Sequence, residues 1–241
     1  MKSFTRLGVA TATAALATAA AALPAQAQSQ AQAQSARLAA AANGGLSAAQ
    51  TLATARIDGR LGTLHALQLA VTDAAHLTGS DRSTLSSLIS GDISGLTSLR
   101  GKVAAETTVA AVRTDETAMV DDYRVYLLVA PKVHLAGAFD IETAAEAALQ
   151  KVHDDLAAKL AAASGGGTAT EKSELADLQA QIKAAQQAST GKVAGLLAIQ
   201  PGPDADAIRA DLSPLVSAAK SARKALQQAR TDARELRAAL K

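Results

Sequence analysis

A helical spacing of apolar residues continues over 109–164, and this run limits the folds open to the chain more than any other feature. Its apolar positions include Val112, Met119, Val120, Tyr123, Leu127, Leu135, Ile141, Leu149, Val152, Leu156 and Leu160. At 1.5 Å per residue, a helix over this range is about 80 Å long. Pro131 lies inside the run, so we expect a kink at that residue.

Four shorter helices are predicted from the same period of apolar residues and from the turn residues between the runs. They cover 48–77, 80–106, 171–199 and 205–241. Thr168 and Glu171 form a capping box before the third of them. Only 2% of the chain is aromatic, and much of the 49% that is hydrophobic is alanine. Sandwiches, barrels and doubly wound nucleotide folds are therefore unexpected.

The lengths of these helices predict an all-α, elongated, antiparallel bundle over 47–241. Each shorter helix spans about 40 Å, half the length of the long one. One helical hairpin can therefore pack along each half of the long helix, which gives two three-helix bundles sharing one helix kinked at Pro131. The alternative is a single compact bundle of four or five helices.

The first 27 residues have the pattern of a Sec-type signal peptide. Lys2 and Arg6 precede an apolar stretch from Leu7 to Leu23, and Ala25-Gln26-Ala27 matches a cleavage site. Residues 28–46 alternate glutamine with small residues and then reach Gly44-Gly45, which indicates a flexible lead-in. We therefore expect a secreted protein, extracellular or attached to the cell wall, with no membrane span after cleavage.

Export would also change the charge. The whole chain carries 24 basic and 22 acidic residues, a net charge of +2. Removal of 1–27 takes away two basic residues and no acidic ones, so 22 of each remain. A protein made for nucleic acid keeps a large positive excess, and we expect no nucleic-acid partner.

No arrangement typical of a metal or catalytic site is present in the sequence. His65 and His76 are three helical turns apart, about 16 Å, which is too far for one zinc ion. His153 precedes two aspartates whose side chains diverge on a helix, and there is no cysteine. Because no nucleophile motif occurs either, we expect no metal, no cofactor and no enzymatic activity.

The central segment holds the three aromatic residues that follow the leader. Tyr123, Tyr126 and Phe139 lie within 17 residues of one another, around Pro131 and His134. Apolar residues on more than one face predict that several neighbouring helices bury this segment, with His134 as a hydrogen-bonded core residue. The alternative is a pocket at the kink that binds an apolar or amphipathic ligand.

The same segment carries a resemblance. The run DYRVYLLVAPKVHLAGAFD, Asp122 to Asp140, resembles the signature of a group of exported, alanine-rich helical proteins of high-GC actinobacteria. The likeness implies export and helical architecture over 48–241. It carries over no functional residue.

One charged feature points to a partner. The basic residues of the last predicted helix are Lys220, Arg223, Lys224, Arg230, Arg234 and Arg237. They can hold an acidic cell-wall polymer or lipid headgroups, or they can form a solvated face with Asp232 and Glu235 interleaved. Another envelope protein is a further partner that the sequence leaves open. The sequence thus predicts an exported, non-catalytic protein with a structural or interaction role. A ligand-binding module near Pro131 is the alternative.

Overall fold

The computed structural model describes residues 45–240, and every regular element in that range is helical. The predicted leader, and the lead-in up to residue 44, lie outside the described residues. The elements are α2 (Leu46–Asp73), α3 (Gly79–Ala105), α4 (Val109–Asp121), the π-helical turn η1 (Val125–Val129), α5 (Ala130–Ala162), the 3-10 turn η2 (Ser164–Gly166), α6 (Ala169–Ser189), α7 (Lys192–Ala198) and α8 (Ala205–Ala239). The prediction of an all-helical chain is confirmed for this range.

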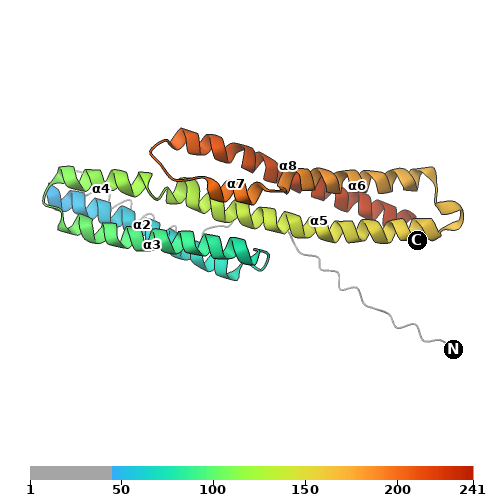
Figure 1. Cartoon of the computed structure of the whole chain (residues 1–241), viewed down its shortest axis with the longest axis horizontal. Helices are drawn as coiled ribbons and strands as arrows, with labels where there is room; N and C mark the ends of the chain where they lie inside the picture. The colour runs from blue at the N-terminus through green and yellow to red at the C-terminus, as the bar shows by residue number, and fades with distance from the viewer. Residues whose placement is uncertain (1–44, 241) are drawn as a thin grey trace, which may run out of the picture.

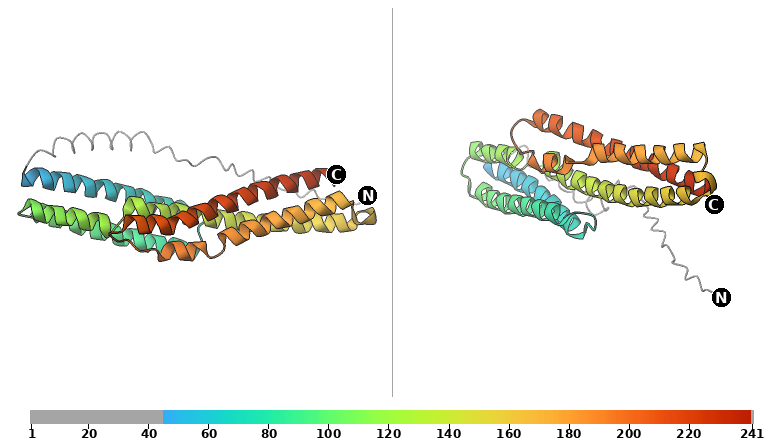
Figure 2. Two further views of the ribbon diagram at one scale, coloured as in Figure 1. Left: turned by 90° about the horizontal axis from the view of Figure 1, so that it is seen from above. Right: turned by 45° about the vertical axis from the view of Figure 1, so that its right-hand side comes forward.

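The helices lie side by side along one long axis (Figure 1). α2, α3 and α4 pack together in one half, while α5, α6 and α8 pack together in the other. Figure 2 shows the two groups following one another along the axis in two further views. α7 packs against α5 near the middle.

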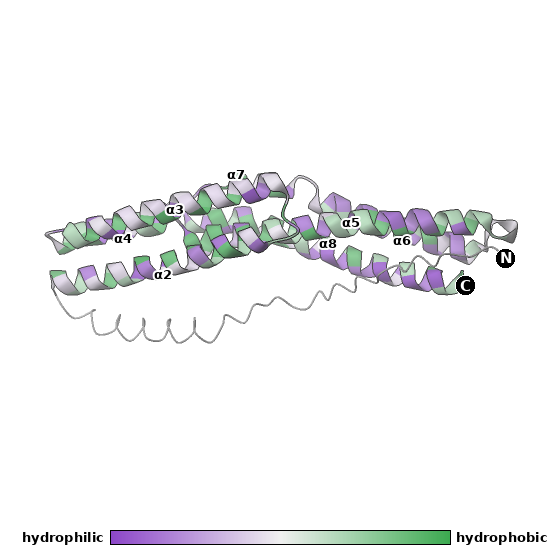
Figure 3. Ribbon diagram, turned by 90° about the horizontal axis from the view of Figure 1, so that it is seen from below, coloured by the Kyte–Doolittle hydropathy of each residue, from purple (hydrophilic) through white to green (hydrophobic). Residues whose placement is uncertain are grey.

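Two hydrophobic cores correspond to these groups. The first contains Ile57, Leu64, Ile89, Leu96 and Met119. The second contains Leu156, Leu178, Ile182, Ala229 and Leu236. Figure 3 shows hydrophobic and hydrophilic residues alternating along each helix, as amphipathic helices require. α5 contributes to both cores, so it connects the two halves.

The predicted long helix is divided, and the division is not at Pro131. α4 ends at Asp121, and Arg124 adopts a left-handed backbone conformation with φ of 43° before η1 begins. Pro131 lies in the first turn of α5, where its missing N–H has the least effect on a helix. The expectation of a single helix over 109–164, kinked at Pro131, is therefore corrected.

The predicted helix over 171–199 is also divided. Gly191 has φ of 73° and separates α6 from α7. A left-handed conformation is readily available only to glycine, so this residue ends α6 before the proline-rich turn at 201–203. The predicted capping box is confirmed: Thr168 N donates to Glu171 Oε2 at 2.7 Å, and Glu171 N donates to Thr168 Oγ1 at 3.2 Å.

Candidate functional site

The break between α4 and η1 is attached to the loop that joins α7 to α8. Arg124 Nε donates to the carbonyl of Gly202 at 2.7 Å, and its Nη2 donates to the carbonyl of Pro203 at 2.6 Å. The same Nη2 donates to Asp121 Oδ1 at 2.8 Å. One side chain therefore joins the end of α4 to a loop 78 residues further along the chain.

A buried lysine near the start of α5 makes a second connection, from α5 to the end of α7. Lys132 is only 3% exposed, and its Nζ donates to the carbonyls of Leu197 (3.0 Å) and Ile199. The last carbonyls of a helix lack partners within the helix, so the ammonium group satisfies the C-terminal end of α7. Burial lowers the pKa of Lys132, and the charge of Asp92 opposes that shift.

A cavity of about 90 Å³ lies between these segments. Its walls come from α3, the link between α4 and η1, η1, the start of α5, α7 and the loop after α7. The lining residues are Thr84, Leu88, Asp92, Tyr123, Leu128, Val129, Lys132, Leu197, Gln200 and Pro201. We call it the junction pocket. Its lining combines leucine side chains with a carboxylate and an ammonium group, which is the composition of a site for a small amphipathic ligand.

Asp92 is the group in the junction pocket that lacks a partner. Its Oδ2 atom is buried and accepts no hydrogen bond from the described residues. Burial raises the pKa of Asp92 to about 6, and the nearby charge of Lys132 limits the rise. A buried polar atom without a partner is unfavourable, so a ligand that donates a hydrogen bond to Oδ2 gains a contact that the protein does not supply.

The five predicted central residues occupy different environments. Tyr123 is half-buried and lines the junction pocket, whereas Tyr126 is 55% exposed with the Arg60 guanidinium 5.3 Å from its ring centroid. Phe139 is 1% exposed, and Pro131 is half-buried. Only Tyr123 among these residues therefore lines the junction pocket.

His134 is exposed, so its assignment to the core is wrong. The assignment assumed one helical period from Tyr123 through His134. The left-handed residue at Arg124 and the π-helical turn after it change that period, and His134 consequently points to solvent.

The predicted basic residues of α8 lie on one side of the helix. Spacings of three, four and seven residues bring them onto that side. Arg230 is half-buried, and the other five are exposed. None of the six makes an ion pair within the described range. We call this set the basic face: Lys220, Arg223, Lys224, Arg230, Arg234 and Arg237.

The acidic residues expected to alternate with the basic face do so only in part. Asp232 is 9% exposed and accepts a hydrogen bond from Gln228 Nε2 at 2.7 Å, so it lies on the inner side. Glu235 remains exposed. In the other half of the molecule, by contrast, Arg100 Nε pairs with Asp58 Oδ1 at 2.7 Å. The basic face therefore keeps charge that could act on a partner.

The sequence analysis missed the buried ionisable residues. Lys132 and Glu142 are 3% and 4% exposed, and Asp92 is half-buried with a buried Oδ2 atom. All three stand next to apolar neighbours in the sequence. Their burial could have been inferred from the sequence, because each of them lies on an apolar stripe of its helix. Within 45–240, no group of three or more metal-binding side chains comes together. His153 Nδ1 lies 3.0 Å from Asp154 Oδ1.

Comparisons with known proteins leave the site to be interpreted from its geometry. No family model, no curated protein and no solved structure matches the chain significantly. Among the helices of the described range, none combines the length and the apolar character needed to cross a membrane.

Proposed function

We propose that this chain is an exported, non-catalytic helical protein that acts by contact in the cell envelope or the medium. In this proposal a Sec-type leader directs secretion, and the group of α2, α3 and α4 together with the group of α5, α6 and α8 forms an elongated body. The observation that carries the contact role is the basic face of α8, whose six side chains have no ion-pair partner in the described range.

The basic face suits an extended acidic partner. From Lys220 to Arg237 it covers about 25 Å of helix. Charges at this spacing attract a polymer that carries repeated negative groups, and salt weakens such attraction between exposed charges. An acidic cell-wall polymer has this chemistry, and an acidic envelope protein would present it over a shorter length.

Cosedimentation of the secreted chain with purified cell walls tests the proposal. We expect binding at low salt that is lost at high salt. Arg234→Gln with Arg237→Gln should weaken it, whereas Arg113→Gln with Lys151→Gln, which removes two exposed charges from other helices, should leave it unchanged. Absence of binding at low salt, or equal losses in the two variants, would refute a role for the basic face.

The junction pocket supports a second candidate, a binding module for an amphipathic ligand near Pro131. The supporting observation is Asp92 Oδ2, which is buried without a partner among the described residues, in a cavity that leucine side chains also line. A short alkylammonium ion offers the donor and the apolar body that these groups would contact.

Propylammonium is a suitable probe of this pocket. We expect it to shift the NMR signals of Leu88 and Leu128, and Asp92→Asn should abolish these shifts. Asp58→Asn removes an exposed carboxylate of α2 and serves as the control. Identical titrations of the native chain and Asp92→Asn would exclude a site at Asp92.

A further inference from the structure

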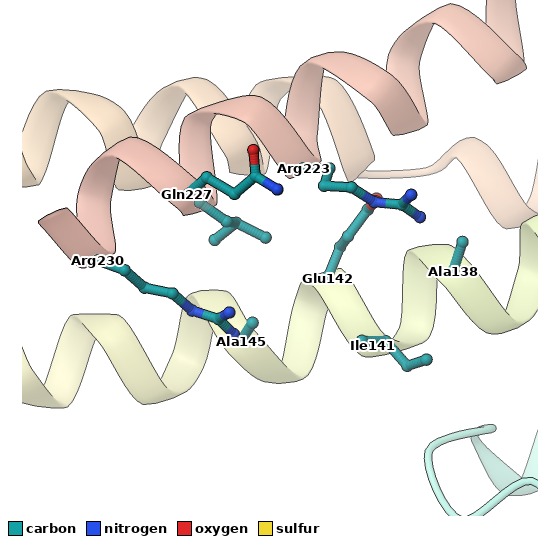
Figure 4. Close-up of a pocket in the computed structure, with 8 residues that line it drawn as sticks. Ala138, Ile141, Glu142, Ala145, Arg223, Gln227 and Arg230 are labelled. Atoms are coloured by element: carbon teal, nitrogen blue, oxygen red, sulfur yellow. The ribbon is translucent and has the colours of Figure 1, made fainter. Parts of the chain in front are cut away.

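A crevice lies between α5 and α8, separate from the junction pocket (Figure 4). It has a volume of about 60 Å³, and its lining consists of Ala138, Ile141, Glu142, Ala145, Arg223, Leu226, Gln227 and Arg230. Half of these eight residues are aliphatic. Ile141 is 37% exposed, one of three large hydrophobic residues exposed in the described range. The crevice therefore offers an apolar surface that neighbouring helices leave uncovered.

Glu142 is the buried acid of this crevice. Its side chain extends from α5 toward α8 in Figure 4, and the residue is 4% exposed. Neither of its carboxyl oxygens has a hydrogen-bond partner among the described residues. An ionised carboxylate in this position is strongly unfavourable unless it acquires a partner or a proton.

Two arginines of α8 line the same crevice. Arg223 and Arg230 extend from α8 toward α5 in Figure 4, and neither is within ion-pair distance of a described carboxylate. Two guanidinium groups beside one acid give the crevice a net positive charge. They therefore repel a ligand cation and attract a ligand anion.

We propose that the crevice between α5 and α8 binds a single-chain anionic amphiphile, with its acidic head between Arg223 and Arg230 and its alkyl chain against Ala145 and Ile141. The arginines supply charged donors for the head group. The aliphatic lining and the exposed part of Ile141 give the first carbons of the chain a surface to cover. Glu142 lies between these two parts of the site.

The protonation state of Glu142 should control binding of this ligand. In its neutral form the Glu142 carboxyl can donate a hydrogen bond to the anionic head, whereas the ionised form repels the head. Burial raises the pKa of Glu142 to about 7, against the opposing charge of Arg223 and with a smaller contribution from Glu146. Binding therefore takes up a proton, and affinity should fall as the pH rises through 7.

The groups facing Glu142 set this pH range. α8 presents the two arginines, and Glu146 lies one turn further along α5. From α6, the Ser189 hydroxyl donates to Glu146 Oε1 at 2.8 Å, which favours the ionised form of Glu146. If only neutral Glu142 admits the anion, one linked proton lowers the affinity about tenfold between pH 6 and pH 8.

Calorimetric titration of the secreted chain with octanoate tests the proposal, because octanoate stays ionised at both pH values. We expect saturable binding that is about tenfold weaker at pH 8 than at pH 6. Octylammonium, which has the same chain and the opposite charge, should bind at least tenfold more weakly than octanoate at pH 6 if the arginines select the head. Saturable binding should be accompanied by proton uptake when two buffers of different ionisation enthalpy are compared.

Single substitutions identify the residues that bind octanoate and cause the pH dependence. Arg223→Gln and Arg230→Gln should each reduce octanoate binding about tenfold, while Lys224→Gln, on α8 but outside the crevice lining, should not. Glu142→Gln keeps a neutral donor of similar size and should bind octanoate equally at pH 6 and pH 8. No saturable binding at pH 6, equal binding of octylammonium, or an unchanged pH dependence in folded Glu142→Gln would overturn the proposal.

The Arg234 and Arg237 variants of the cell-wall experiment distinguish this site from the proposed cell-wall contact. Arg234 and Arg237 belong to the basic face but do not line the crevice. Their replacement by glutamine should weaken binding to walls and leave octanoate binding intact. Octanoate binding without wall binding would therefore support the crevice while refuting the contact role, and the reverse result would refute the crevice alone.

Discussion

Gly95 and Gly91 provide a matched pair of substitutions one turn apart on α3. A Cβ atom built on Gly95 would lie 2.7 Å from Cε1 and 2.9 Å from Cζ of Tyr123, with the Tyr123 hydroxyl closer still. A Cβ atom on Gly91 would meet nothing within 4 Å. The absence of a side chain at Gly95 therefore lets the Tyr123 ring pack directly on α3, against one wall of the junction pocket.

The two substitutions should differ in their effect on stability. Gly91→Ala improves helix propensity and should raise the free energy of unfolding by about 1 kcal/mol. Gly95→Ala gains the same amount but displaces the Tyr123 ring, and overpacking of this kind costs about 1–3 kcal/mol. The Gly95 variant should therefore be less stable than the Gly91 variant by about 1–3 kcal/mol.

Urea unfolding followed by circular dichroism at 222 nm measures this difference, provided that the slopes agree among the variants. A second background isolates the cause. With Tyr123→Leu in place, Gly95→Ala should become stabilising by about 1 kcal/mol, as at Gly91. Equal stabilities of the two alanine variants in the native background would refute the contact between Tyr123 and α3.

Three further predictions concern buried or strained residues. Lys132→Met should lower the unfolding free energy by about 1–3 kcal/mol, because two carbonyls at the end of α7 lose their donor, and chemical denaturation measures the loss. Arg124→Ala should speed amide hydrogen exchange in 199–204, because it removes the bonds to Gly202 and Pro203; unchanged exchange would contradict that connection. The pKa of Glu142 is raised to about 7 from an ordinary value of 4.5, so the folded state binds more protons between these values. Stability should therefore fall as the pH rises from about 4.5 to about 7, and thermal melts of Glu142→Gln should show a smaller fall.

Structural features that depend on contacts between neighbours along the chain could be predicted from the sequence. The capping box at Thr168 and Glu171 requires only contacts within one turn, and it was found where the pattern placed it. The helical class follows similarly from the spacing of apolar residues. These features could be predicted because neighbours along the chain determine them.

Features that depend on distant segments could not be predicted in the same way. The Arg124 guanidinium donates hydrogen bonds to the carbonyls of Gly202 and Pro203, and nothing near Arg124 in the sequence indicates these partners. Lys132 stands in an apolar run as an ordinary surface lysine would, and only the position of α7 makes it a buried donor. Gly191 did offer a local signal for the division of the predicted helix over 171–199, because glycine favours left-handed turns.

The course of α5 has a consequence for how the molecule unfolds. Between Ala136, its last buried residue in the first core, and Leu149, its first in the second, α5 buries Asp140, Glu142 and Glu146. Burial raises the pKa of all three carboxyls. At neutral pH this acidic stretch should uncouple the unfolding of the two cores. One core should then open to solvent without the other, and hydrogen exchange should detect two cooperative units. Mild acid removes the charge, and the two halves should then open together.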